Sequence, residues 1–282
     1  MRRARTSASG LVALLNVRYL LTMPSRPYIL AESTWATVRE TRYEVAILPW
    51  GATEAHNLHL PYATDTIQCD ALAADAARAA WDAGARVVVL PTVPFGVNTG
   101  QLDIALCLNM NPSTQAALLA DLVGVVERAG VRKLVIFNGH GGNDFRQMLR
   151  ELQPKTSLFL CTLNWWQALD TRPYFDEPGD HAGELETSVM MRVAPHLVRP
   201  LAEAGDGREL RFRIDGLRER WVWAQREWPR ITTDTGVGNP KAASPEKGTR
   251  YMDALSSRIG EFLVALAAAD PVDMYETTGG GR

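Results

Sequence analysis

The sequence contains little cysteine, and its charge is nearly balanced. Cys69, Cys107 and Cys161 are the three cysteines among 282 residues, and they are too far apart to form a CxxC pair. This spacing disfavours a disulfide framework and a cysteine-based zinc site, and it predicts free thiols in a reducing, cytoplasmic compartment. A formal net charge of −2 gives no indication of a nucleic-acid partner or of binding to an acidic membrane surface.

Long uninterrupted apolar runs are also absent. The apolar stretch 11–23 is broken by polar residues and is too short to span a bilayer. No clear small-residue cleavage site follows it, so residues 1–26 are predicted to be a disordered N-terminal extension rather than a signal peptide. The glycine-rich residues 273–282 are predicted to be a flexible tail, which leaves 27–272 as a single domain.

Short apolar runs alternate with helical patterns along the chain. We expect strands at 44–50, 86–91, 133–138 and 157–162, and helices at 65–83, 111–130, 143–152, 184–193 and 250–269. Strands separated by helices predict an α/β fold, a three-layer α/β/α sandwich with a mostly parallel central sheet. The segment 195–248 is rich in Arg, Trp, Gly and Pro and has no clear period, so we expect it to cover a site or to form a subunit contact.

Four of the five histidines lie in three short motifs that also contain carboxylates. The motifs run from Glu54 to Asp65, from Asn138 to Asn143, and from His181 to Ser188. The first two directly follow predicted strands, and the carboxyl ends of parallel strands meet at one edge of a sheet. Histidine and carboxylate are the ligands that zinc, manganese and iron accept in proteins. The sequence therefore predicts a metal site at this edge, and it favours a hydrolase.

Several residues in these motifs allow two interpretations. Asp65 either caps the helix that follows it or bridges two metal ions. The glycines around His140 are typical of an anion-binding turn, but such a turn does not explain the histidine at its centre. Glu184 and Glu186 are two residues apart, so on a helix they point to different faces and only one should reach a metal.

Together the three motifs resemble the signatures of the creatininase (creatinine amidohydrolase) family, in the same order and at similar separations over residues 28–193. The resemblance implies a three-layer α/β/α fold, hydrolysis of a C–N bond, and two divalent metal ions per chain, which would be zinc, manganese or iron. It also implies a homo-oligomer, commonly a hexamer. The ligands that it implies, with Asp65 bridging, are Glu54, His56, Asp65, His140 and Glu186.

The resemblance also implies roles around the metals. His181 resembles the family's catalytic histidine, a proton shuttle, and Glu184 is the alternative proton donor. The residues expected to contact the substrate are His59, Gly141, Trp165 and Trp166. The two tryptophans would form an aromatic wall for a flat heterocycle, unless they are core residues. Among the departures from the family, Gly142 stands where creatininase has a glutamate, and Asn57 where glycine is usual.

These features favour an amidohydrolase that hydrolyses a small cyclic amide or a formamide with a metal-activated water. The glycine at position 142 favours amidohydrolase activity in this broad sense over the specific activity of creatininase. One alternative is a creatininase-like peptidase. Another is a non-enzymatic α/β protein that binds an anion or nucleotide at the glycine-rich turn, and a third is a structural subunit that has lost activity.

Overall fold

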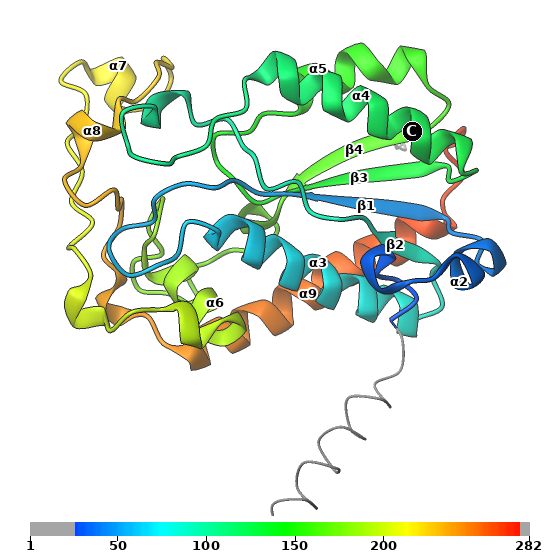
Figure 1. Ribbon diagram of the computed structural model, residues 1–282, viewed down its shortest axis with the longest axis horizontal. Coiled ribbons are helices and arrows are strands. Elements are labelled where there is room, and N and C mark those ends of the chain that lie inside the picture. Colours follow the sequence, from blue (N-terminus) through cyan, green and yellow to red (C-terminus); the bar gives the residue numbers. More distant parts are fainter. Residues whose placement is uncertain (1–25, 277–282) are drawn as a thin grey trace, which may run out of the picture.

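A computed structural model describes residues 26–276 of the chain. Its centre is a four-stranded sheet in the order β2-β1-β3-β4, in which every pair of neighbouring strands is parallel (Figure 1). The strands are β1 (Val45–Trp50), β2 (Val87–Val89), β3 (Lys133–Asn138) and β4 (Phe159–Asn164). Of the two predicted terminal segments, 1–26 and 273–282, residues 1–25 and 277–282 lie outside the described residues.

Helices cover both faces of the sheet, which confirms the predicted three-layer α/β/α sandwich. One layer contains α3 (Thr64–Asp82), α6 (Glu184–Val193) and α9 (Pro245–Ala268), and the opposite layer contains α4 (Pro112–Arg128) and α5 (Arg146–Leu152). Three shorter helices are α2 (Trp35–Glu40), α7 (Asp215–Arg218) and α8 (Trp228–Ile231). No helix within residues 26–276 is long and apolar enough to cross a membrane.

The apolar residues of the central strand β1 divide between two cores. Val45 and Ile47 pack against the α3, α6 and α9 layer, whereas Ala46, Leu48 and Trp50 pack against the α4 and α5 layer. This alternation follows from the two-residue period of a strand, whose side chains point to opposite faces in turn. Because both faces are covered, β1 is a continuous buried apolar run.

The strand order places a topological switch point beside β1. The chain passes from β1 to β2 on one side and then returns to β3 on the other side of β1. Trp50 and Asn138, the last residues of β1 and β3, are paired across the sheet. The loops that leave them diverge towards opposite layers, and the crevice between such loops is where ligands bind in open α/β sheets.

The segment 195–248 lies at this same end of the molecule. In Figure 1, α7 and α8 are at the left, beside the short 3-10 helix η2 (Thr99–Gln101). The side chain of Thr99 hydrogen-bonds to Gln225 at 3.3 Å, and Trp228 packs on His181 with ring centroids 4.8 Å apart. The segment thus packs against the motif-bearing loops, in agreement with one of the two expectations from the sequence.

Candidate metal centre

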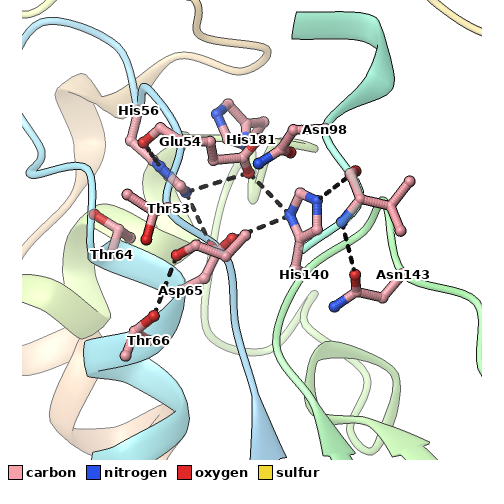
Figure 2. A network of polar contacts seen from close by, with 12 residues as sticks. Thr53, Glu54, His56, Thr64, Asp65, Thr66, Asn98, His140, Asn143 and His181 are labelled. Atoms are coloured by element: carbon pink, nitrogen blue, oxygen red, sulfur yellow. Dashed lines mark hydrogen bonds and ion pairs between the residues drawn. The ribbon is translucent and has the colours of Figure 1, made fainter. Parts of the chain in front are cut away.

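Side chains from three loops and two helices converge at the switch point between β1 and β3. Figure 2 shows those from the loop after β1, the start of α3, the loop after β3 and the loop before α6, and one more comes from α6 itself. Five of them are buried and the last is partly buried: Glu54, His56, Asp65, His140, His181 and Glu186. These six include all the residues for which the sequence predicted metal binding.

One half of the cluster is built around His140. Its Nδ1 atom lies 3.0 Å from Glu54 Oε1 and 3.1 Å from Asp65 Oδ2. The three ligand atoms are within 4.8 Å of one another, a separation that one metal ion can span. This arrangement offers one nitrogen and two carboxylate oxygens to a cation.

The other half is built around His56 and shares Asp65 with the first. His56 Nε2 lies 3.0 Å from Asp65 Oδ1 and 3.9 Å from Glu186 Oε2. Asp65 therefore directs a different oxygen atom at each of the two histidines. That is the geometry expected of a carboxylate that bridges two metal ions.

Backbone carbonyl groups orient the three imidazole rings of the cluster. Each ring has one nitrogen within hydrogen-bonding distance of a backbone oxygen, which requires an N–H at that nitrogen. The contacts are His56 Nδ1 to Glu54 O at 3.1 Å, His140 Nε2 to Val97 O at 3.1 Å, and His181 Nε2 to Ala55 O at 2.9 Å. In the neutral rings, the lone pair of the remaining nitrogen then faces the carboxylates.

This orientation fits bound cations. A lone pair that faces a carboxylate oxygen is repelled by it unless a proton or a metal ion lies between them. Asp65 Oδ2 is buried and, among residues 26–276, makes no hydrogen bond of good geometry, although His140 Nδ1 is 3.1 Å away. The residues present therefore fit divalent metal binding in both chemistry and geometry.

In the absence of metal, protons take the place of cations in the cluster. Burial opposes the charging of His56, but Asp65, Glu186 and Glu54 raise its pKa to about 10. Burial also opposes the charging of His140, but Glu54 and Asp65 raise its pKa well above the usual value. Burial acts against ionisation of Asp65, yet the two histidines lower its pKa.

The structure distinguishes between the two glutamates of α6. Burial raises the pKa of Glu186, against the effect of His56 and His181, and its Oε2 accepts a hydrogen bond from Ala182 N at 2.5 Å. Glu184 is fully buried elsewhere: its carboxylate pairs with Lys247 and accepts from Glu177 N at 2.7 Å. The expectation that Glu184 acts as a proton donor therefore conflicts with the structure, because both of its oxygens are already engaged away from the cluster.

Close packing explains the glycine at position 142. A Cβ atom there would lie 2.2 Å from Val97 O and 2.5 Å from His140 Nε2. The backbone oxygen that orients His140 thus occupies the space that a side chain at 142 would need. A glutamate cannot stand at this position without displacing that contact, and Glu186 supplies a carboxylate from the opposite side of the cluster.

The other departure from the family, Asn57, also has a structural reason. Its backbone has φ of +52°, a left-handed conformation that asparagine adopts more easily than most residues. Its Oδ1 accepts hydrogen bonds from Leu58 N at 2.6 Å and from Gly205 N at 2.8 Å. Asn57 therefore fixes the turn after His56 and ties it to the segment 195–248.

The four expected substrate-binding residues lie in different surroundings. His59 is buried behind the cluster, where its Nε2 contacts Thr187 Oγ1 at 2.9 Å and burial lowers its pKa to about 4. Gly141 is exposed, with open space where a side chain would project. Trp165 is buried in the core against Tyr251, and Trp166 packs on its edge. The packing of the tryptophans is thus that of core residues rather than of an exposed aromatic wall.

Two residues of the cluster's surroundings were missed by the sequence analysis. Asn98 lies beside His140 and His181 in Figure 2, and its buried Oδ1 has no hydrogen-bond partner within residues 26–276. Gln101 is buried and donates from its amide to Glu54 Oε2. Both belong to the segment between β2 and α4, which carries no histidine or carboxylate motif. Only their position in the folded chain reveals them.

Comparisons with known proteins point to one family. A family model described as creatininase, creatinine amidohydrolase, matches residues 31–263. The crystal structure of a "putative creatinine amidohydrolase" from Bacteroides fragilis NCTC 9343 superposes with a TM-score of 0.84 at 43% identity, over 90% of this chain and 100% of that one. The structure named "Creatininase Mn" gives a TM-score of 0.71 at 22% identity, over 86% and 99% of the two chains.

A relative with a different activity in its name is also similar. The mycofactocin precursor peptide peptidase of Mycobacterium tuberculosis H37Rv is 29% identical over 219 residues, which are 74% of this chain and 80% of the peptidase. Because the family model spans most of the sequence, and because the three motifs meet in one cluster, this chain belongs to the creatininase family.

Proposed function

We propose that this protein is a metal-dependent amidohydrolase that hydrolyses the C–N bond of a small cyclic amide or a formamide. The observation that carries the proposal is the bridging arrangement of Asp65, whose two oxygens face His56 and His140 separately. Glu54 completes one set of ligands and Glu186 the other. An anion-binding protein would have no use for two buried carboxylates and a third partly buried one at its site, so the cluster disfavours that alternative.

The metals that suit these ligands are zinc, manganese and iron. Structures similar to this chain include a manganese form and a Zn-Zn form of creatininase. When bound, such a pair supplies a water of lowered pKa as nucleophile and polarises the amide carbonyl. The residues of the chain contribute by holding that pair, by excluding bulk water and by moving a proton.

His181 is the proposed carrier of the proton. Its ring lies 4.1 Å from the ring of His56 and 4.8 Å from that of Trp228, so it is held between two neighbours. Its Nε2 is engaged by Ala55 O, which leaves Nδ1, 3.6 Å from Glu54 Oε1, as the atom that faces the cluster. A proton accepted at this nitrogen can be donated to the departing amine.

We propose that Asn98 contacts the substrate. Its Nδ2 donates to Leu108 O at 3.0 Å, which fixes the amide and leaves its Oδ1 without a partner among residues 26–276. A buried acceptor without a donor is costly, by about 1–3 kcal/mol. A substrate that presents an N–H to this oxygen removes that cost, and amides and lactams have such a group.

Peptide hydrolysis is the second candidate function. The relatives that favour it are the mycofactocin precursor peptide peptidases of Mycobacterium tuberculosis and Mycobacterium ulcerans, of which 80% and 87% align with this chain. The chemistry at the metal pair would be the same, because a peptide bond is also an amide. What differs is the room needed on either side of the cleaved bond.

We further propose a cytoplasmic homo-oligomer, with a hexamer as the family resemblance implies. Support comes from exposed aromatic residues on the segment 195–248, where Trp221 and Trp223 are 76% and 80% exposed. Aromatic residues are enriched at protein interfaces. Free cysteines within the described residues fit a reducing compartment.

Elemental analysis of the purified protein is the first test. The wild type should contain about two equivalents of zinc, manganese or iron per chain. His140→Ala should lose at least one, while His196→Ala should lose none because His196 is exposed outside the cluster. Cleavage assays with lactams, formamides and short peptides then separate the two candidate functions. A wild type without metal, even after reconstitution, would exclude both.

A further inference from the structure

Glu54 is the carboxylate at which the imidazoles of the cluster meet. Its Oε1 lies 3.0 Å from His140 Nδ1, 3.6 Å from His181 Nδ1 and 4.0 Å from His56 Nε2. Its Oε2 has a different neighbour, the side-chain amide of Gln101, which donates a hydrogen bond to it. The two oxygens of one carboxylate therefore have separate partners.

Gln101 is itself held in one orientation. It is 3% exposed, at the end of η2 and 47 residues along the chain from Glu54. Cys107 Sγ lies 3.3 Å from Gln101 Oε1, and Ala55 N donates to the same sulfur at 3.3 Å. Burial raises the pKa of Cys107, so its thiol stays protonated and can donate to the amide oxygen.

We propose that Gln101 is a positioning residue for the metal ligand Glu54, and that Cys107 fixes the orientation of its amide. The inference rests on the proposed metal-dependent function. With the thiol donating to Oε1 of Gln101, the NH2 group must face Glu54. A flipped amide would place its oxygen against the carboxylate, and two acceptors repel each other. The hydrogen bond occupies Oε2 and leaves Oε1 free at the centre of the cluster.

The consequence is a preorganised ligand. A glutamate that lacks this contact can rotate about its terminal torsion, which is broad for carboxylates, and each rotation moves Oε1 away from the histidines. Hydrogen bonds from outside the ligand set that hold a ligand in this way are typically worth a factor of 10 to 100 in metal affinity. Gln101 removes that freedom before a cation binds.

The element that carries Gln101 is supported from the segment 195–248. A Cβ at Gly100 would lie 2.2 Å from Arg226 O and 3.2 Å from Trp228 Cδ1, so η2 packs tightly on this segment. Trp228 in turn contacts His181. The same packing therefore positions Glu54 through Gln101 and the proton-carrying His181 through Trp228.

The test is the affinity of the metal-free protein for Zn²⁺, measured by competition with a chromophoric chelator. Gln101→Leu should bind Zn²⁺ about 10- to 100-fold more weakly than the wild type. Cys107→Ala should weaken binding less, by severalfold, and Cys107→Ser should restore it because a hydroxyl can also donate. Val123→Ala removes buried volume in α4, on the opposite layer, and should lower Tm without changing the affinity.

The outcomes separate this inference from the proposed function. Wild-type protein that binds no Zn²⁺ overturns both. Wild-type protein that binds Zn²⁺ while Gln101→Leu binds it within about twofold overturns the positioning role alone. Should Gln101→Leu fail to fold, the comparison of Cys107→Ala with Cys107→Ser carries the test, and equal affinities for the two variants would refute it.

Discussion

Asp65 contacts two histidines through separate oxygen atoms. Its Oδ1 contacts His56 and its Oδ2 contacts His140, and each histidine belongs to a different group of ligands. The interpretation of Asp65 as a helix cap is wrong, because α3 begins at Thr64 and the residue in the cap position is Ala63. Its place in the first turn still gives the carboxylate a favourable interaction with the helix dipole.

Substitution of the bridging residue should affect both metals at once. Asp65→Asn keeps the size of the side chain but removes its charge and one acceptor oxygen. We expect bound zinc to fall from about two equivalents to less than one, whereas Glu186→Gln should remove about one. Elemental analysis after gel filtration measures both variants. If Asp65→Asn keeps one tightly bound equivalent, Asp65 belongs to a single subsite.

At the residue scale, the sequence indicates the candidate metal ligands more readily than the residues that hold those ligands in position. Histidines and carboxylates in short motifs predict a site because they are the ligands that zinc, manganese and iron accept. The choice between Glu184 and Glu186 depends on Lys247, about sixty residues away, which pairs with Glu184 and so removes it from the cluster. Gln101 and Asn98 have common side chains in a segment without a motif, and only tertiary contacts identify them.

A largely buried ion pair links α6 and α9. Glu184, at the start of α6, is fully buried, and Lys247, in the first turn of α9, is 24% exposed. Lys247 also contacts Ala242 O at 3.0 Å and Asp176 at 2.9 Å. The pair thus joins two helices and the loop before His181. We therefore assign it a role in stabilising the fold rather than in catalysis.

Removing one member of the pair should destabilise the protein more than removing both. Lys247→Met leaves the Glu184 carboxylate buried without its cation, and we expect the free energy of unfolding to fall by about 2–3 kcal/mol, a value reduced because Lys247 is partly exposed. The double variant Glu184→Leu with Lys247→Met should recover part of this loss. Urea unfolding of the metal-free proteins measures each value. A Lys247→Met variant as stable as the wild type would contradict the assigned role.

At the element scale, the errors of prediction have local causes. β4 begins at Phe159 rather than at 157, because Ser157 N and Oγ both bond to Glu127 at 2.6 Å and are unavailable to the sheet. The last helix begins at Pro245 rather than at 250, because Ser244 caps it by accepting from Lys247 N. The first turn of this helix is polar, so the apolar periodicity that predicts a helix begins only later in the sequence. The serine followed by proline is nevertheless a helix-start signal.

Over the whole molecule, buried charge is concentrated at the loop end of the sheet. Burial resists ionisation of Glu54 and Asp65, but the histidines lower the pKa of both. This contribution to stability is present above the pH at which free carboxylates titrate, about 4, and is lost as the pH falls through the lowered values. The raised pKa values of His56 and His140 have the opposite effect, because their contribution to stability is lost as the pH rises. The metal-free fold should therefore be most stable near neutral pH.

Metal should change how stability depends on pH above neutrality. The pKa of His56 is raised to about 10, so its protonation stabilises the metal-free fold below about pH 6.5 and this contribution is lost as the pH rises towards 10. Each pKa unit is worth about 1.4 kcal/mol, so we expect the Tm of the metal-free protein to fall by about 5 °C or more over this range. The zinc-loaded protein should lose less, because bound cations replace the protons between the histidines and the carboxylates. Thermal unfolding of both forms from pH 6.5 to 10 measures the difference, and parallel curves would show that protons and metal do not compete for the cluster.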